Sequence, residues 1–247
     1  MIRAMIFDLD GTLVQTEKLK ALSYAQAALE LCPDDVSEDE VVAAFADVVG
    51  RSRREVAVFL MQRFGLEDAA RALVPKYKVS TPWQAFVQLR VRYYAAILDN
   101  PEVLRRNQWP HNVALLQEAQ RTGCKTGLAT MSTCTQAHAV LEALDLADAF
   151  DFVASRDDVE HGKPDPEIYQ LMAHQLAMPA GQCLVIEDSP SGVRAALAAG
   201  MWCIVVTTTL TRQAIHSERL VEERWIVDDP STLTDVVRRM VTERAAD

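Results

Sequence analysis

The chain has 247 residues, of which 49% are hydrophobic and 24% charged, and its formal net charge is −10. This length and apolar content predict a folded protein with a substantial core, built as one large or two small domains. The excess of negative charge argues against nucleic acids and anionic membranes as partners. An anionic ligand would have to be attracted locally, by a metal ion, a basic side chain or the amino end of a helix.

The amino-terminal segment is a short apolar run that ends in acidic residues. Residues 1–7 are typical of a buried strand, and Asp8, Asp10 and Gly11 follow at once. Because Arg3 is the single charge of the run and the acidic pair comes directly after it, we expect no signal peptide. No apolar run approaches the length that spans a bilayer.

The five cysteines are odd in number and form no Cys-x-x-Cys pair. They are Cys32, Cys124, Cys134, Cys183 and Cys203. We predict that all of them are reduced packing residues in a cytoplasmic protein.

Residues 16–98 are predicted to be helical throughout. One helix covers 16–31, a capping box at 37–40 opens the next, a third runs over 52–64, and a second capping box at 81–84 opens a helix that continues to 98. We expect this region to be an inserted helical cap domain, with residues 1–15 and 99–247 forming the core.

From Pro110 onward the pattern alternates between helix and strand. Strands are predicted over 125–129, 150–154, 183–186, 202–206 and 225–227, with helices between them and a last helix after 229. Such alternation predicts an α/β protein with a parallel, Rossmann-like sheet and helices on both faces. Because the insert leaves the sheet beside the acidic pair, we expect it to cover that pair and to hinge near 14–16 and 99–109.

Asp8 and Asp10 lie where the first strand ends, which is the ligand-binding edge of an open α/β sheet. Side chains two apart in an extended segment point the same way, so these carboxylates would repel each other without a cation. Mg²⁺ suits such a pair, because it takes one or two carboxylates, waters and a substrate phosphate. The simpler alternative is that both residues only end a strand and begin a turn at Gly11.

Residues 8–12, Asp-Leu-Asp-Gly-Thr, resemble the signature of the haloacid dehalogenase superfamily. The whole chain resembles the branch with a small helical cap, which includes phosphoglycolate phosphatase and β-phosphoglucomutase. The resemblance implies that Asp8 is the nucleophile that becomes an aspartyl phosphate. It also implies that Asp10 is the general acid and base.

Two further segments fit phosphate binding. Thr130, Met131 and Ser132 follow a predicted strand and lead into a helix, an arrangement that places a hydroxyl and N–H groups at a strand end. The resemblance makes Thr130 and Met131 the second motif, although many relatives carry Asn where Met131 stands. Lys163, between Gly162 and a proline, resembles the third motif and would neutralise the nucleophile and the incoming phosphate.

Glu187 and Asp188 repeat the pattern of the amino terminus, with an apolar strand before them and a helix after. The segment from 183 to 200 resembles the fourth motif. Asp8, the Asp10 carbonyl, Glu187 and Asp188 are therefore the predicted Mg²⁺ site, with Asp188 as a direct ligand and Glu187 as a ligand or a water-mediated partner.

We predict a Mg²⁺-dependent phosphatase that hydrolyses a small phosphorylated metabolite, such as a sugar phosphate or a phosphoglycolate-like compound. The first alternative is a sugar-phosphate mutase of the β-phosphoglucomutase kind. Gln15 and Lys20 stand where the mutases carry Asp and His, which argues against it. Arg53 occupies the position of the arginine with which the mutase cap holds a second phosphate, so we also predict a second anionic group on the substrate.

Three other functions fit less well. A haloalkanoic acid dehalogenase uses no metal and lacks the second carboxylate, Asp10. A phosphonate hydrolase needs a cap lysine, for which Lys18 and Lys20 are remote candidates. A binding protein without activity would have lost catalytic positions that this chain retains. The sequence leaves the oligomeric state open and is compatible with a monomer.

Overall fold

The computed structural model describes residues 1–32, 34–48 and 52–246. The chain divides into two compact units, an α/β unit formed by Met1–Gln15 and Leu104–Asp247, and a helical unit formed by Thr16–Val103. The helical unit thus starts at the predicted residue and extends slightly beyond the predicted boundary at 98.

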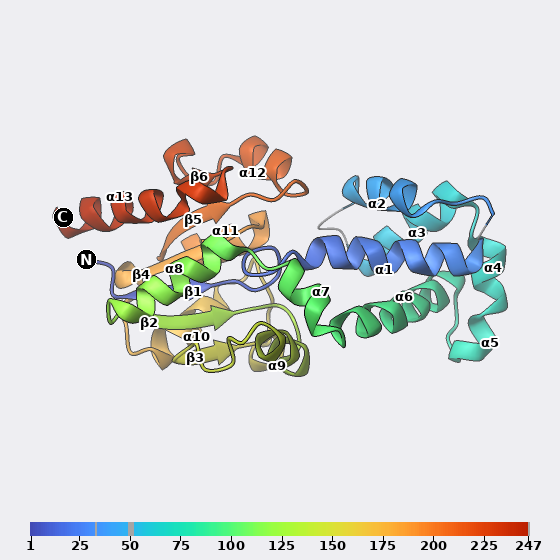
Figure 1. Ribbon diagram of the computed structural model, residues 1–247, viewed down its shortest axis with the longest axis horizontal. Coiled ribbons are helices and arrows are strands. Elements are labelled where there is room, and N and C mark those ends of the chain that lie inside the picture. The colour runs from blue at the N-terminus through green and yellow to red at the C-terminus, as the bar shows by residue number, and fades with distance from the viewer. Residues whose placement is uncertain (33, 49–51, 247) are drawn as a thin grey trace. The chain divides into compact units, whose positions relative to one another are not determined.

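The α/β unit is built on a parallel sheet of six strands in the order β3-β2-β1-β4-β5-β6 (Figure 1). The strands are β1 (Ala4–Phe7), β2 (Lys125–Ala129), β3 (Phe152–Ala154), β4 (Cys183–Glu187), β5 (Trp202–Val206) and β6 (Ile226–Val227). The predicted Rossmann-like α/β fold is confirmed. β1 is the first strand in the chain, yet it lies inside the sheet, where Phe7 is in register with Leu128 and Ile186.

Helices cover both faces of this sheet. They are α8 (Pro110–Arg121), α9 (Cys134–Ala143), α10 (Glu167–Gln175), α11 (Pro190–Ala198), α12 (Arg212–Glu218) and α13 (Leu233–Ala246). Apolar side chains of α10 and α11, such as Met172 and Val193, pack against one sheet face at Ile6 and Val185. α8 contacts β2, and α13 packs against α8 and β5. The alternation of strand and helix therefore produces the layered core that the sequence predicts.

The helical unit has its own apolar core. Its helices are α1 (Thr16–Leu31), α2 (Glu38–Ala46), α3 (Arg53–Phe64), α4 (Glu67–Ala72), α5 (Val74–Tyr77) and α6 (Pro82–Leu98), and α7 (Pro101–Arg106) follows. α1 and α6 pack along each other. The Tyr24 ring of α1 lies 5.6 Å from the Phe45 ring and 5.8 Å from the Phe86 ring, measured between centroids.

The helix ends test the predicted capping signals. Ser37 and Glu40 form the predicted capping box, and α3 ends at Gly65, whose φ of 66° is left-handed. The second predicted box is wrong, because the Thr81 side chain accepts no backbone N–H. Instead the Thr81 hydroxyl donates to the Gln84 side-chain oxygen over 2.9 Å. The Gln84 oxygen also accepts from the Ser80 N–H over 3.1 Å, so the glutamine binds the residues before the helix although the hydroxyl does not cap it.

Among the helices of the described residues, none combines the length and the apolar character that crossing a bilayer requires. All five cysteines have free thiols. Cys134 is exposed, so the prediction that every cysteine packs in the interior is wrong at that position.

Candidate active site

Three neighbouring strands bring the predicted site residues to one edge of the sheet. Asp8 follows β1, Thr130 follows β2, and Glu187 and Asp188 stand at the end of β4. Because β2, β1 and β4 are adjacent and parallel, their carboxyl ends meet at the same edge. Residues separated by most of the chain therefore form one cluster.

Lys163, from the loop before α10, connects these strand ends. Its Nζ donates to Asp8 Oδ1 over 2.7 Å, to Glu187 Oε1 over 2.7 Å and to the Ala129 carbonyl over 2.9 Å. Only 3% of the Lys163 side chain is exposed. All three ammonium protons thus meet acceptors, which is what a buried lysine needs to keep its charge.

Glu187 is held entirely by protein donors. Lys163 and the Tyr169 hydroxyl donate to Oε1, the latter over 3.2 Å. Oε2 accepts from the Asp188 N–H over 2.8 Å, the Ser189 N–H over 2.9 Å and the Ser189 hydroxyl over 3.0 Å. A Cβ on Gly192 would lie 1.6 Å from Oε1. The first turn of α11 therefore accommodates this carboxylate only because residue 192 is glycine.

Asp10 is oriented by two hydroxyls from the end of β2. Its Oδ2 accepts from Thr130 Oγ1 over 3.2 Å and from Ser132 Oγ over 2.7 Å. Ser132 was not predicted to be a site residue, because a serine before a helix is usually a cap. Here the cap of α9 is Thr133, which frees Ser132 to bind Asp10. A second hydroxyl two residues after Thr130 was the available signal.

Asp188 lies against the turn that follows Asp10. Gly11 has a φ of +88°, and a Cβ built on it would lie 2.0 Å from Asp188 Oδ2. Glycine is required here both for the left-handed backbone and for the close approach of the carboxylate.

Asp8, Glu187 and Asp188 are buried, and each offers one carboxylate oxygen within 4.8 Å of the others. Within the described α/β unit, the Lys163 ammonium pairs with two carboxylates of this site, Asp8 and Glu187. Carboxylates gathered this closely in a buried site favour a cation, and oxygen ligands suit a hard divalent ion. The residues therefore fit a divalent metal site.

The charges at the site depend on one another. Burial raises the pKa of Asp8 to about 7, Glu187 and Asp10 add to the rise, and Lys163 opposes it. Burial acts to lower the pKa of Lys163, but Asp8 and Glu187 outweigh it and raise that pKa well above its ordinary value. Burial and Glu187 also raise the pKa of the Tyr169 phenol, which stays a hydrogen-bond donor.

Two further predicted residues have other surroundings within their own units. Met131 is half-buried and packs against the apolar core beside the sheet, and its Sδ lies 3.0 Å from the point where a Gly162 Cβ would stand. Arg53 is the first residue of α3 in the helical unit and is exposed.

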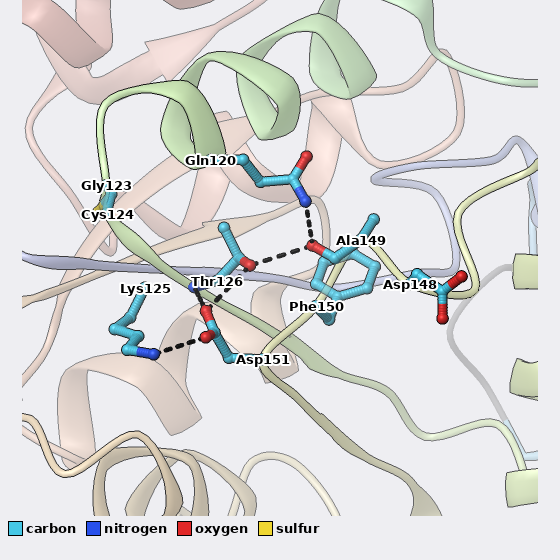
Figure 2. A pocket seen from close by; sticks show the side chains of 9 residues that line it. All are labelled: Gln120, Gly123, Cys124, Lys125, Thr126, Asp148, Ala149, Phe150 and Asp151. Atoms are coloured by element: carbon cyan, nitrogen blue, oxygen red, sulfur yellow. Dashed lines mark hydrogen bonds and ion pairs between the residues drawn. The ribbon is translucent and has the colours of Figure 1, made fainter.

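A cavity of about 350 Å³ lies at the other end of β2 (Figure 2). It is lined by Lys125 and Thr126 at the start of that strand and by Asp151. Lys125 donates to Asp151 over 2.6 Å, and the Thr126 N–H donates to the same carboxylate over 2.8 Å. Lys125, Thr126 and Asp151 are thus paired with one another, and the cavity is separate from the acidic cluster.

Residues 2–200 match the haloacid dehalogenase-like hydrolase family. The chain belongs to this family. The phosphoglycolate phosphatase of Salmonella typhimurium is 34% identical over 212 residues, which cover 81% of this chain and 79% of that enzyme. The family resemblance predicted from residues 8–12 is therefore confirmed.

Two solved structures share the fold of this hydrolase. A putative β-phosphoglucomutase from Thermotoga maritima has a TM-score of 0.73 and 26% identity, covering 96% of this chain and 99% of that one. CbbY from Rhodobacter sphaeroides, in complex with xylulose-1,5-bisphosphate, has a TM-score of 0.59 and 27% identity, covering 86% and 89%.

Proposed function

We propose that this hydrolase is a Mg²⁺-dependent phosphatase for a small phosphorylated metabolite, of the sugar-phosphate or phosphoglycolate class. The observation that carries the proposal is the position of Lys163, which bridges Asp8 and Glu187 at the edge where Asp10 and Asp188 converge. One cation beside several carboxylates suits phosphoryl transfer, in which charge on the transferred oxygens must be neutralised.

In the first step, a carboxylate oxygen of Asp8 attacks the phosphorus atom in line with the ester oxygen. The bond from phosphorus to that oxygen breaks, and an aspartyl phosphate forms. Asp10, oriented by Thr130 and Ser132, gives its proton to the departing oxygen. Lys163 stays beside Asp8 and offsets the charge of the phosphoryl group.

In the second step, Asp10 takes a proton from water, and the water oxygen attacks phosphorus. The bond between phosphorus and the Asp8 oxygen breaks, which releases inorganic phosphate and restores both carboxyl groups. The same carboxyl thus serves as acid and then as base.

Asp8 and Asp188 are the proposed direct ligands of Mg²⁺, together with the Asp10 carbonyl. Bound Mg²⁺ would supply charge neutralisation at the transferred oxygens. Glu187 already accepts five hydrogen bonds from protein donors. We therefore assign it to orienting Lys163 and Asp188, and to contacting the metal only through water.

The test is to measure turnover over a panel of sugar phosphates, phosphoglycolate and nucleotides with the Asp8→Asn variant. We expect no phosphoenzyme in quenched samples examined by mass spectrometry, and no turnover above background. Asp148→Asn is the matched control, because Asp148 is exposed and lines the separate cavity. Retained turnover in Asp8→Asn would contradict the nucleophile assignment.

The second candidate is a sugar-phosphate mutase, which the similarity to a putative β-phosphoglucomutase favours. Gln15 and Lys20 argue against it, as neither is the Asp or His expected of a mutase. Arg53 is proposed to contact a second anionic group of the substrate in either case. Assays with and without a bisphosphorylated sugar primer separate the two, since only a mutase needs the primer and yields an isomer instead of phosphate.

A further inference from the structure

The loop that carries Lys163 has little regular structure of its own. β3 ends at Ala154 and α10 begins at Glu167, and the described residues between them form a single short 3₁₀ turn, Arg156–Asp158. The Lys163 ammonium nevertheless meets three acceptors at once, over 2.7 to 2.9 Å. Because hydrogen bonds of this kind need distances of about 2.7–3.2 Å, the backbone that carries Lys163 has to be held in one conformation.

Glu167 holds the amide groups of this loop. Its Oε1 accepts from the Glu160 N–H over 2.8 Å, and its Oε2 accepts from the His161 N–H over 2.8 Å. The imidazole Nδ1 of His161 lies 3.1 Å from the same Oε2. These bonds, first that from the Glu160 N–H, lower the pKa of the Glu167 carboxyl, which therefore accepts them as a carboxylate at neutral pH. The two amides belong to the residues three and two positions before Lys163.

Arg156 holds the carbonyl groups of the same segment. Its Nη1 donates to the Val159 carbonyl over 2.6 Å, and its Nη2 donates to the Glu160 carbonyl over 3.2 Å. The Arg156 N–H donates to the Ser132 carbonyl over 3.0 Å, which ties the loop to the segment that follows β2. The backbone at 159–161 is thus held through its carbonyls by one side chain and through its amides by another.

Glu167 is attached to a fixed part of the molecule. It is the first residue of α10, and the next two residues, Ile168 and Tyr169, are fully buried in the core beside the sheet. Packing in a close-packed core restricts the movement of this helical turn. The carboxylate therefore extends the rigidity of α10 to a loop that has few contacts of its own.

We propose that Glu167 is a positioning residue, which holds the 159–161 backbone so that the Lys163 ammonium reaches its three acceptors. Glu167 acts through the loop rather than by contact with the transferred phosphoryl group. Its effect on turnover rests on the proposed phosphatase function, whereas its effect on Lys163 does not.

The first experiment measures how fast acetic anhydride acetylates Lys163, with Lys125 as the internal reference. Wild-type Lys163 should react far more slowly, since 3% of its side chain is exposed against 49% for Lys125. Glu167→Gln replaces one acceptor oxygen by an amide group that cannot accept from an N–H, so the loop should open more often. We expect the ratio of Lys163 to Lys125 acetylation, measured by mass spectrometry of peptides, to rise at least about 10-fold. An unchanged ratio would overturn the proposal.

Glu160→Gln is the matched control. Glu160 lies in the same loop, its side chain is exposed, and in the described part of the chain its hydrogen bonds all come from its backbone. The same loss of charge at this position should leave the acetylation ratio and kcat unchanged. If Glu160→Gln raised the ratio as much as Glu167→Gln, loss of charge alone would explain the result, and the positioning contact would be refuted.

A measurement on the wild type guards against misfolding of the variant. The Glu160 and His161 N–H groups belong to exposed residues, yet the proposal requires Glu167 to hold both. Hydrogen exchange followed by NMR should be at least about 10-fold slower at these two amides than in an unstructured peptide of the same sequence. Exchange at the rate of the peptide would also overturn the proposal.

The third experiment separates kcat from KM for the ester that the wild type hydrolyses best. A misplaced Lys163 ammonium would neutralise less of the charge on the transferred oxygens, so Glu167→Gln should lower kcat roughly 10- to 100-fold with KM little changed. Glu167→Asp keeps the charge on a shorter side chain, and its kcat should fall by less. A lower Tm with normal kcat would make Glu167 a structural residue only and contradict the proposal.

The three experiments keep the two proposals apart. If the wild type hydrolyses no ester, the phosphatase proposal fails, while acetylation and hydrogen exchange still decide whether Glu167 positions Lys163. If the wild type is active but Glu167→Gln changes neither kcat nor the acetylation ratio, the phosphatase proposal stands and the positioning role of Glu167 fails.

Discussion

Lys163 directs its three donors to acceptors from three different strands of the α/β unit. Asp8 follows β1, Ala129 ends β2, and Glu187 ends β4. Without this ammonium, the Asp8 and Glu187 carboxylates would face each other in a buried site. A single side chain therefore connects the strand ends on which the proposed chemistry depends.

Lys163→Met should lower the free energy of unfolding by about 3–5 kcal/mol, the usual cost of leaving a buried charge unpaired. Lys125→Met is the control, because Lys125 pairs with Asp151 at the surface, where such pairs contribute at most about 1 kcal/mol. Urea unfolding of the metal-free proteins measures both. If both variants lost the same small amount of unfolding free energy, the contacts of Lys163 with Asp8 and Glu187 would add no stability.

The raised pKa of Asp8 predicts proton release when Mg²⁺ binds. With a pKa of about 7 in the metal-free protein, Asp8 is mostly protonated at pH 6, half ionised at pH 7 and mostly ionised at pH 8. Binding to a cation requires the carboxylate, so release should approach one proton at pH 6 and fall toward zero at pH 8. Calorimetry in buffers of different ionisation enthalpy measures the number of protons released per Mg²⁺ bound. The Asp8→Asn variant should show no such release. Release that increases with pH would contradict the assignment.

At the scale of elements, the end of β4 and the first turn of α11 together position the Glu187 carboxylate. Ser189 caps the helix by accepting from the Gly192 N–H over 3.1 Å, and its hydroxyl also donates to Glu187. Gly192 then leaves room for that carboxylate beneath the first turn. The acid is thus positioned by the same residues that start the helix.

Gly192→Ala should destabilise the protein by about 1–3 kcal/mol and reduce kcat, because the new methyl group would displace the Glu187 carboxylate. Gly181→Ala is the matched control, since a Cβ there meets nothing within 4 Å. Thermal unfolding and a phosphatase assay of both variants test this. A Gly192→Ala enzyme with normal kcat would show that Glu187 need not be fixed in place.

Much of this architecture could be predicted from the sequence, because the signals were local. Apolar runs bounded by acids and turns located the strands, and α1 has the predicted bounds of 16–31. The site residues could be grouped because parallel strands end at one edge. The hydroxyl two residues after Thr130 marked Ser132 as a candidate, but its partner Asp10 could not be predicted, nor could the contact of Tyr169 with Glu187, since both depend on which side chains face each other across elements.

For the whole molecule, the net charge of −10 and the acidic cluster give the proposed metal a structural role beside its catalytic one. Acids from distant parts of the chain converge at the strand ends. A shared cation would relieve their repulsion and so stabilise the fold as well as enable turnover.

Removal of divalent metal should therefore have two effects. EDTA should abolish activity reversibly and lower Tm, and Mg²⁺ should restore both. Asp188→Asn should lose most of the Mg²⁺-dependent rise in Tm, because it removes one of the two proposed carboxylate ligands. Full activity in EDTA would contradict the metal-dependent mechanism and revive the dehalogenase alternative.

The interior position of β1 has a consequence for how the polypeptide is made. β1 is synthesised before its sheet neighbours β2 and β4, which begin only at Lys125 and Cys183. The helical unit, Thr16–Val103, is complete before either neighbour exists. Since domains generally fold in the order of synthesis, β1, which leads directly to Asp8, remains unpaired while the helical unit folds behind it. We expect the nascent chain to be most prone to aggregate during that interval.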